Sequence, residues 1–271
     1  MILESYLKNK SPFIGLFLGK QGCGKTSAIA SFCEEGRMLC YDLDKRIAGI
    51  RGSLNFLHSD ILSKIEVEQF SIKDGFAAID KALEILIIKQ SSNPTYKTIW
   101  IDSASTFHDF LLEDSKKLRG AKSMTSGKVR GTIQFNDPDD YNYASTAFQK
   151  LFYVFLGELK CNLIFSGWVV DRYAKPPNEP YANAEVVGQK LLATDKFAER
   201  IPGLFDEVYF FSKEETGMVS DPLHYKVEFE NNIAKTSQPG LRNKGKVDIT
   251  NKSFYQVWKD LVNNSNQQEK K

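Results

Sequence analysis

The sequence predicts an α/β fold in which helices cover both faces of a mostly parallel β-sheet. Segments with the apolar spacing of helices, most clearly 76–89 and 143–159, alternate with short apolar runs. Such runs are typical of strands buried on both faces, and they occur at 13–18, 38–41, 98–101 and 162–165, with later ones at 207–211 and 225–229. Because strands that alternate with helices favour parallel pairing, the order of these segments indicates a sheet with helices on either side.

The length of 271 residues is enough for one large α/β domain. We see no internal repeat or linker, and we therefore expect a single domain over residues 1–262. The polar residues 263–271 are expected to form a disordered tail. The least regular segment is 115–140, which we expect to be a long basic loop or insertion, because long loops in compact domains are often functional or disordered.

Composition excludes several classes of function. The formal net charge is only +2, so any surface for nucleic acid must be local. Four cysteines without a CxxC pair, together with three histidines, argue against a zinc site, and the cysteines do not suggest a disulfide framework. No apolar run approaches the length of a membrane span, and the N-terminus lacks the pattern of a signal peptide. We expect a cytoplasmic protein with no membrane partner.

The sharpest signal is the glycine-rich turn after the first apolar run, which reads GKQGCGKT at 19–26 and matches G-x-x-x-x-G-K-[ST] in full. Its glycines let backbone N–H groups converge on phosphates, and the helix that begins there adds its positive end. Lys25 is expected to reach the β- and γ-phosphates, and the Thr26 hydroxyl to bind Mg²⁺. The predicted nucleotide-binding residues are Gly19, Lys20, Gln21, Gly22, Cys23, Gly24, Lys25, Thr26 and Ser27.

Asp102 ends the apolar run 98–101 and is our candidate for the second ligand of Mg²⁺, because ligands of open α/β sheets bind beyond the carboxyl ends of strands. The alternative is a turn or helix-capping aspartate, since Ser103 follows. Asp44 lies just past the run 38–41 and is our candidate for the group that orients the attacking water. Asp42 is the alternative for this role, and ordinary loop solvation would also explain both carboxylates.

Ser166 follows the run 162–165 and is a candidate for sensing the γ-phosphate. Trp168, two residues later, is explained either by packing or by stacking on the nucleotide base. The catalytic residues that the sequence predicts are therefore Lys25, Asp44 and Asp102.

These landmarks, GKQGCGKT at 19–26, MLCYDLD at 38–44 and TIWIDSAST at 98–106, resemble the RecA-like branch of P-loop ATPases. More closely, the chain resembles phage-encoded nucleotide-binding proteins with AAA-type ATP-binding domains, a group that includes phage recombinases of the single-strand-annealing class. The segments 139–168, 196–211 and 225–241 are similar to later parts of these proteins, so the resemblance covers nearly the whole chain.

The resemblance implies a RecA-like P-loop NTPase core that uses ATP and Mg²⁺ and hydrolyses ATP when bound to DNA. It implies a role in phage recombination or replication in the host cytoplasm, self-assembly, and possible association with other phage recombination or replication proteins. Lys235 lies in AKT at 234–236, where relatives carry a basic residue near the nucleotide, here expected to act on a neighbouring subunit. Two positions depart from the family pattern: Asp44 stands where glutamate is usual, and Trp168 where many relatives have a polar residue.

A run of basic residues without an acidic one, 115–131, follows the strand that ends at Asp102. A mobile basic loop of this kind suits the phosphate backbone of single-stranded DNA, although a solvated loop would read the same way. Its cations, and our candidate DNA-binding residues, are Lys116, Lys117, Arg119, Lys122, Lys128 and Arg130.

Two other functions fit the same motif. A small-molecule kinase would share the phosphate-binding loop and add an acceptor pocket and lid arginines, for which Arg172 and Arg200 are candidates. A module that binds nucleotide without hydrolysing it, as a switch or assembly factor, would explain the departures at Asp44 and Trp168.

Overall fold

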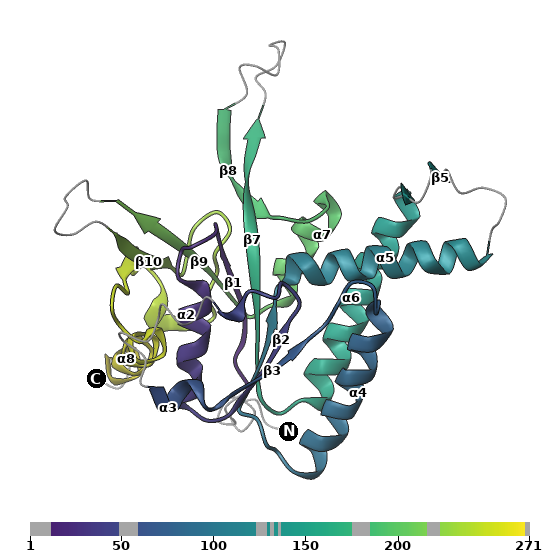
Figure 1. Ribbon diagram of the computed structural model, residues 1–271. Coiled ribbons are helices and arrows are strands. Elements are labelled where there is room, and N and C mark those ends of the chain that lie inside the picture. Colours follow the sequence, from purple (N-terminus) through teal and green to yellow (C-terminus); the bar gives the residue numbers. More distant parts are fainter. Residues whose placement is uncertain are drawn as a thin grey trace, which may run out of the picture.

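The computed structural model describes residues 12–48, 59–122, 129–130, 133–134, 137–174, 185–215 and 223–268. Nine strands of this part form one sheet (Figure 1). Its parallel strands are, in spatial order, β9 (Glu207–Glu214), β1 (Ile14–Gly19), β7 (Asn162–Ala174), β4 (Thr98–Asp102), β2 (Met38–Asp42) and β3 (Ile65–Gln69). Antiparallel strands complete it: β10 (His224–Glu228) and β11 (Lys246–Asp248) beyond β9, and β8 (Glu185–Leu191) beside β7. The predicted fold class, α/β with a mostly parallel sheet flanked by helices, is confirmed.

Helices cover both faces of the sheet, as Figure 1 shows. One face carries α4 (Phe76–Ser92), α5 (Ala104–Lys122), α6 (Pro138–Glu158) and α7 (Asp195–Arg200). The other carries α2 (Lys25–Ala30), α3 (Ser59–Leu62) and α8 (Phe254–Gln268). Short 3₁₀ turns are η1 (Ser31–Glu34), η4 (Ile201–Leu204) and η5 (Pro239–Leu241). Successive residues of β1 face opposite sides, so Leu16 and Leu18 enter one buried core and Phe17 the other, which explains why the strand is apolar throughout.

The parallel strands end at one edge of the sheet, and this carboxyl edge positions the candidate site. β1 lies between β7 and β9, and its last residue, Gly19, is in register with Trp168 of β7. On the other side of β7, Asp42 of β2 is in register with Asp102 of β4. Residues that the sequence separates by up to about 150 positions are therefore neighbours at this edge.

β7 continues past the edge of the sheet as one strand of an arm, with β8 as the other strand (Figure 1). β7 pairs with β4 as far as Phe165 and with β1 as far as Trp168, and Val169–Ala174 pair with β8. The strand expected at 162–165 is longer than its apolar run, because β8 supplies the backbone partner beyond the body of the domain. Asp171 and Arg172 interrupt the apolar sequence on the arm, and Tyr173 is 60% exposed.

The segment 115–140, which we expected to be a long basic loop or insertion, is helical at both of its ends. α5 continues to Lys122, α6 begins at Pro138, and the described residues between them include a short antiparallel pair, β5 (Val129–Arg130) and β6 (Ile133–Gln134). A hydrogen bond joins α5 to the start of α6: Ser115 is buried and its hydroxyl donates to the carboxylate of Asp140 at 2.7 Å. Packing of α5 against α6 therefore overrides the polar composition of its last two turns.

The boundary of the C-terminal tail is also corrected. α8 runs to Gln268, beyond residue 262, where we expected ordered structure to end. Residues 254–268 contain neither glycine nor proline, so nothing in the sequence interrupts the helix once its first turns pack on the sheet. None of the helices in the described residues is long and apolar enough to cross a membrane.

Candidate nucleotide-binding site

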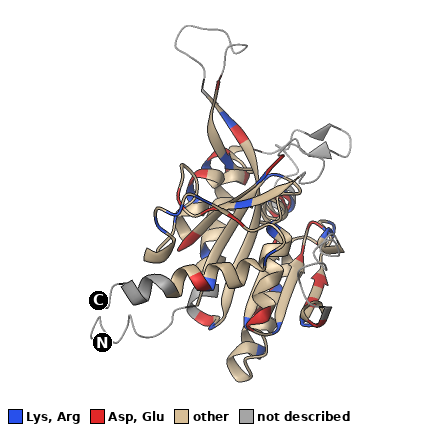
Figure 2. Ribbon diagram, turned by 90° about the vertical axis from the view of Figure 1, so that its left-hand side faces the viewer, with Lys and Arg blue, Asp and Glu red and all other residues tan. Residues whose placement is uncertain are grey.

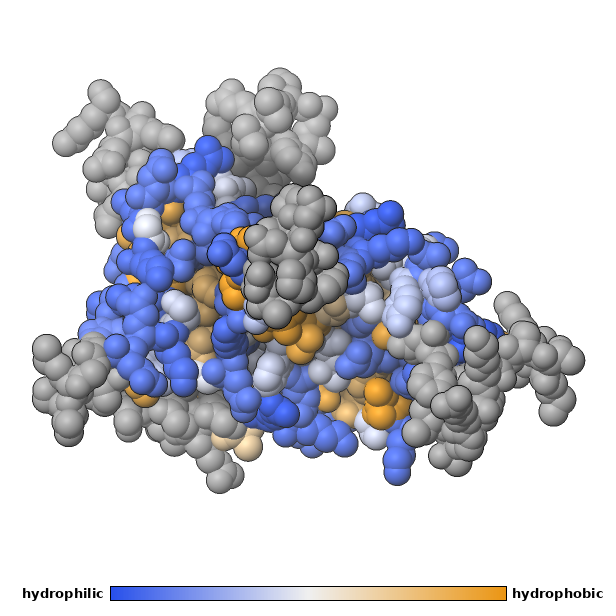
Figure 3. Space-filling model, turned by 90° about the horizontal axis from the view of Figure 1, so that it is seen from above, coloured by the Kyte–Doolittle hydropathy of each residue, from blue (hydrophilic) through white to orange (hydrophobic). Residues whose placement is uncertain are grey.

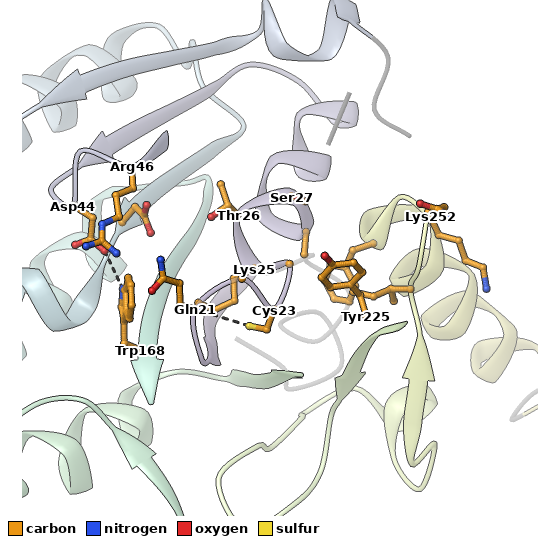
Figure 4. A pocket seen from close by; sticks show the side chains of 17 residues that line it. Gln21, Cys23, Lys25, Thr26, Ser27, Asp44, Arg46, Trp168, Tyr225 and Lys252 are labelled. Atoms are coloured by element: carbon orange, nitrogen blue, oxygen red, sulfur yellow. Dashed lines mark hydrogen bonds between the residues drawn. The ribbon is translucent and has the colours of Figure 1, made fainter. Parts of the chain in front are cut away.

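A pocket of about 540 Å³ opens at the carboxyl edge of the sheet. Seen onto this edge, hydrophobic residues lie between hydrophilic ones (Figure 3). The pocket has the turn after β1 in its middle, with Asp44, Arg46 and Trp168 on one side and Tyr225 and Lys252 on the other (Figure 4). Its lining residues are Gln21, Gly22, Cys23, Gly24, Lys25, Thr26, Ser27, Ala28, Asp44, Arg46, Asp102, Trp168, Tyr225, Ile249, Asn251, Lys252 and Phe254.

The turn between β1 and α2 has the backbone that the glycines of its motif allow. Gly22 and Gly24 have φ angles of 71° and 89°, in the left-handed region that favours glycine. A Cβ atom on Gly19 would lie 2.4 Å from the carbonyl oxygen of Phe211, so this glycine permits the close approach of β9. α2 begins at Lys25, directly after Gly24, and the Ala28 N–H donates to the Gly24 carbonyl at 3.0 Å.

Lys25 is folded back onto the turn itself. Its Nζ donates to the carbonyl oxygens of Gly19 at 2.8 Å and Lys20 at 2.9 Å, and it lies 3.6 Å from the Cys23 Sγ. These neutral acceptors are weaker partners for an ammonium group than phosphate oxygens are. The Lys25 side chain is therefore already inside the turn, where a phosphate group would exchange one set of oxygens for another.

Asp102 and Thr26 line the same pocket, as the sequence predicted for a magnesium site. Asp102 is buried and accepts a hydrogen bond from the Ser166 hydroxyl. Burial raises the pKa of Asp102 to about 6, and the negative charges of Asp44 and Asp42 act in the same direction. A buried carboxylate among others is stabilised by a bound cation.

No cluster of three or more His, Cys, Asp or Glu side chains that would hold a metal by itself occurs among the described residues. Mg²⁺ is usually bound by one or two protein oxygen ligands together with substrate phosphates and water. Thr26 and Asp102 have the required oxygen chemistry at the mouth of the phosphate-binding turn.

The structure separates the two carboxylates that follow β2. Asp42 is fully buried and does not line the pocket; it accepts hydrogen bonds from the Arg46 backbone N–H at 3.0 Å and from Gln69 Nε2 at 2.9 Å. Its role is to hold the turn that follows the strand. Asp44 is half-buried and faces the pocket, which favours it over Asp42 as the group near the γ-phosphate.

Asp44 is itself firmly held. Its Oδ2 accepts from the indole N–H of Trp168 at 2.9 Å, and its Oδ1 accepts from the Ser103 hydroxyl at 3.1 Å and from the Thr106 hydroxyl. Trp168 thus supplies a hydrogen bond from the position where a polar residue is usual in the resembling family. The alternative that Trp168 merely packs is not sufficient, because its indole nitrogen orients a carboxylate.

The side chain of Ser166 is 1% exposed and does not line the pocket. Its hydroxyl donates to Asp102, so Ser166 contacts the candidate magnesium ligand from outside the pocket.

Residues near the C-terminus form the far wall of the pocket, and sequence reasoning missed them. They come from the start of β10 to the start of α8 and are Tyr225, Ile249, Asn251, Lys252 and Phe254. Tyr225 packs so closely on the phosphate-binding turn that a Cβ atom on Gly24 would lie 3.2 Å from its ring. No local motif marks these residues; only the pairing of β10 with β9 brings them to a turn about 200 positions earlier in the chain.

A family model described as an AAA domain matches residues 12–242, which is most of the chain. The chain belongs to the AAA domain family. The match includes the phosphate-binding turn, Asp44, Asp102, Trp168 and Tyr225, but it ends before the last part of the far wall. No curated protein matches the chain. The AAA domain supports binding of a nucleoside triphosphate at the P-loop, which is the coarser part of the function that the sequence predicted.

Lys235 does not line the pocket of this AAA domain. It is exposed, its backbone forms an isolated bridge with Val208 near the start of β9, and its Nζ lies 3.4 Å from the Gly203 carbonyl oxygen. Val208 is in register with Leu16 of β1, three residues before Gly19 at the P-loop, so Lys235 lies away from the turn that lines the pocket.

The predicted DNA-binding cations differ in their surroundings, because two of those on α5 pair with carboxylates. Arg119 forms ion pairs with Asp137 and, at 3.1 Å, with Asp140, and Lys116 pairs with Glu113. Acidic partners that are absent from 115–131 therefore come from the helix turn before it and from the start of α6. Lys117 is exposed, Lys122 ends α5, Arg130 lies in β5, and Lys128 lies outside the described residues. Basic and acidic residues are interspersed on the face shown in Figure 2.

Proposed function

We propose that this protein binds ATP with Mg²⁺ at its P-loop and hydrolyses the bond between the β- and γ-phosphates. The observation that supports this most strongly is the convergence of Lys25, Thr26, Asp44 and Asp102 on one pocket. A P-loop alone would be compatible with any phosphate ligand. The added carboxylates on the same side supply a metal ligand and a group for water, which hydrolysis needs.

In this proposal the Lys25 ammonium group leaves the carbonyl oxygens of Gly19 and Lys20 for the β- and γ-phosphates. The Thr26 hydroxyl and the Asp102 carboxylate hold Mg²⁺, which would neutralise charge on the phosphate oxygens. Asp44 orients the attacking water, and its fixed hydrogen bonds keep its carboxylate in one direction. As an aspartate, it is shorter than the usual glutamate, so we expect slow turnover.

The nucleotide base lies against the far wall in this proposal. Tyr225 offers an aromatic face and Ile249 and Phe254 an apolar surface, while Asn251 and Lys252 add polar groups. This direction places the triphosphate along the P-loop and its γ-phosphate beside Asp44, Arg46 and Trp168 (Figure 4).

Single-stranded DNA is the macromolecular ligand that we propose, with ATP turnover coupled to assembly on it. Lys117, Lys122, Lys128 and Arg130 would contact the phosphate backbone, while Lys116 and Arg119 stabilise the fold through their acidic partners. Self-association would bring the exposed Lys235 towards a neighbouring subunit's nucleotide. The biological setting, phage recombination or replication in the host cytoplasm together with other phage proteins of these processes, follows from the family resemblance.

The test is phosphate release from Mg-ATP, measured with and without single-stranded DNA, for the wild-type protein and for Lys25→Ala. We expect release that DNA stimulates and that the variant lacks. Release that is indifferent to DNA would contradict the DNA-dependent part alone. ATP binding without any release would contradict hydrolysis and favour a nucleotide-dependent switch.

A second candidate function is a small-molecule kinase, and one observation favours it. A second cavity of about 710 Å³ shares Asp44, Arg46 and Trp168 with the nucleotide pocket. Four of its other lining residues carry hydroxyl groups: Ser105, Thr106, Tyr141 and Thr194. The candidate lid residues Arg172 and Arg200 line neither cavity. ATP consumption that requires a small hydroxyl compound and ignores DNA would support this alternative.

A further inference from the structure

We propose that Arg46 is a phosphate-binding residue that the chain supplies to its own nucleotide, with Trp168 as the residue that positions both Arg46 and Asp44. The inference rests on the proposed function, because it assigns Arg46 to the γ-phosphate of the bound triphosphate. No sequence motif marks Arg46.

The backbone of Arg46 is fixed to the centre of the site. Its N–H donates to the buried Asp42 carboxylate at 3.0 Å. Two residues earlier, the N–H groups of Leu43 and Asp44 donate to the Asp102 carbonyl at 2.7 and 3.1 Å. The turn that carries Arg46 is thereby tied to the strand that carries the magnesium ligand, so Arg46 cannot move far from the pocket.

The Arg46 side chain lies over the Trp168 ring, with its guanidinium carbon 4.9 Å from the ring centroid. On the described part of the chain it forms no ion pair with a carboxylate, in contrast to Arg37 and Arg119. The nearby Asp44 carboxylate already accepts hydrogen bonds from Trp168, Ser103 and Thr106. The guanidinium donors therefore remain available to a ligand in the pocket that Arg46 lines.

Electrostatics favour a second cation at this place. Asp44 and Asp102 add negative charge to that of the triphosphate, and Lys25 lies 5.7 Å from the same Trp168 ring on the P-loop side. Arg46 and Trp168 lie together on the side of the P-loop away from Tyr225 and Lys252 of the far wall (Figure 4). A planar guanidinium at that end of the pocket matches phosphate oxygens with two parallel hydrogen bonds.

The discriminating experiment compares the affinity of Arg46→Ala for ADP with its affinity for a non-hydrolysable ATP analogue, both with Mg²⁺. We expect the analogue to bind about 10- to 100-fold more weakly than it does to the wild type, with ADP affinity nearly unchanged. Arg46→Lys should recover only part of the loss, because it restores charge without the planar fork. The matched control is Arg37→Ala, which removes an exposed arginine stacked on Tyr96, 5.6 Å from the ring centroid and outside the pocket.

Trp168→Phe tests the positioning role. It keeps a ring beneath Arg46 but removes the N–H that holds Asp44. We expect kcat for ATP to fall about tenfold while the affinity for the ATP analogue stays within about twofold. Unchanged kcat would show that Trp168 does not position Asp44.

Equal weakening of ADP and the analogue by Arg46→Ala, or no weakening of either, would overturn the assignment of Arg46 to the γ-phosphate and leave the proposed function standing. Failure of the wild-type protein to bind either nucleotide would overturn the proposed function and this inference together. Selective loss of the analogue without any measurable hydrolysis would support Arg46 and reject only the ATPase activity.

Discussion

Replacement of Asp102 by asparagine should stabilise the free protein while removing its response to Mg-ATP. In the folded protein, burial raises the pKa of Asp102 to about 6, from a usual value of 3.8. Since the folded state holds this proton more tightly than the unfolded chain does, the contribution of Asp102 to folding stability is highest below pH 3.8 and falls as the pH rises to about 6. Above that range the ionised carboxylate destabilises the fold to its full extent, and the neutral amide of the variant avoids this cost.

The size of the effect follows from the pKa difference, which corresponds to about 3 kcal/mol as an upper limit at neutral pH. For a chain of this length, such a change raises Tm by roughly 5 to 10 °C. Mg-ATP should stabilise the two proteins unequally: at 100 times its Kd it should stabilise the wild type by about 2.7 kcal/mol, whereas the variant, without its metal ligand, gains far less.

The assay is thermal unfolding at pH 7.5 and pH 4, each with and without Mg-ATP. We expect Asp102→Asn to unfold at a higher temperature than the wild type at pH 7.5 and at a similar one at pH 4. The control is Asp195→Asn, which alters an exposed carboxylate that pairs with Lys190. This pairing lowers the pKa of Asp195, so the substitution should not increase stability. A less stable free variant at pH 7.5, or an undiminished response to Mg-ATP, would refute the reasoning.

Three further predictions concern the hydrophobic core, the far wall of the pocket and α5. Phe148→Ala removes a fully buried ring from the aromatic core and should lower the free energy of unfolding by about 3–5 kcal/mol in urea titrations, whereas Tyr153→Ala on the exposed side of α6 should change it by less than about 0.5 kcal/mol. Tyr225→Ala should lower the affinity for ATP about tenfold or more in equilibrium binding measurements. Tyr225→Phe should keep the wild-type affinity, because stacking needs only the ring. Arg119→Ala leaves the buried Asp140 without its cation, and chemical denaturation should show a loss of about 3 kcal/mol.

The turn after β1 and the place of Asp102 are predictable from the sequence, because contiguous residues specify each of them. Eight successive residues specify the turn after β1, and a short apolar run before Asp102 is enough to place its carboxylate at the edge of a parallel sheet. The choice between Asp42 and Asp44 needed the structure. Only the hydrogen bonds of Asp42 to the Arg46 N–H and Gln69 show that one carboxylate holds the turn and the other faces the pocket.

Other features were not predictable from local patterns because they arise from pairing across the fold. The wall that contains Tyr225 depends on antiparallel pairing of β10 with β9, which no periodicity signals. The long arm depends on β8, which lets β7 continue through polar residues. The segment 115–131 has basic residues and no acidic one, but it gains acidic neighbours when α6 packs beside α5, as the pairing of Arg119 with Asp140 shows.

The most direct test of the central claim, that the P-loop pocket binds the triphosphate of Mg-ATP, is calorimetric titration of Mg-ATP into the wild-type protein and Lys25→Ala. Lys25 makes its polar contacts within the P-loop, so its removal leaves the two cores of the fold unchanged. We predict saturable binding of one nucleotide per chain to the wild type and at least about a tenfold loss of affinity in the variant. Equal affinity of the two proteins, or no binding by a folded wild type, would contradict the claim.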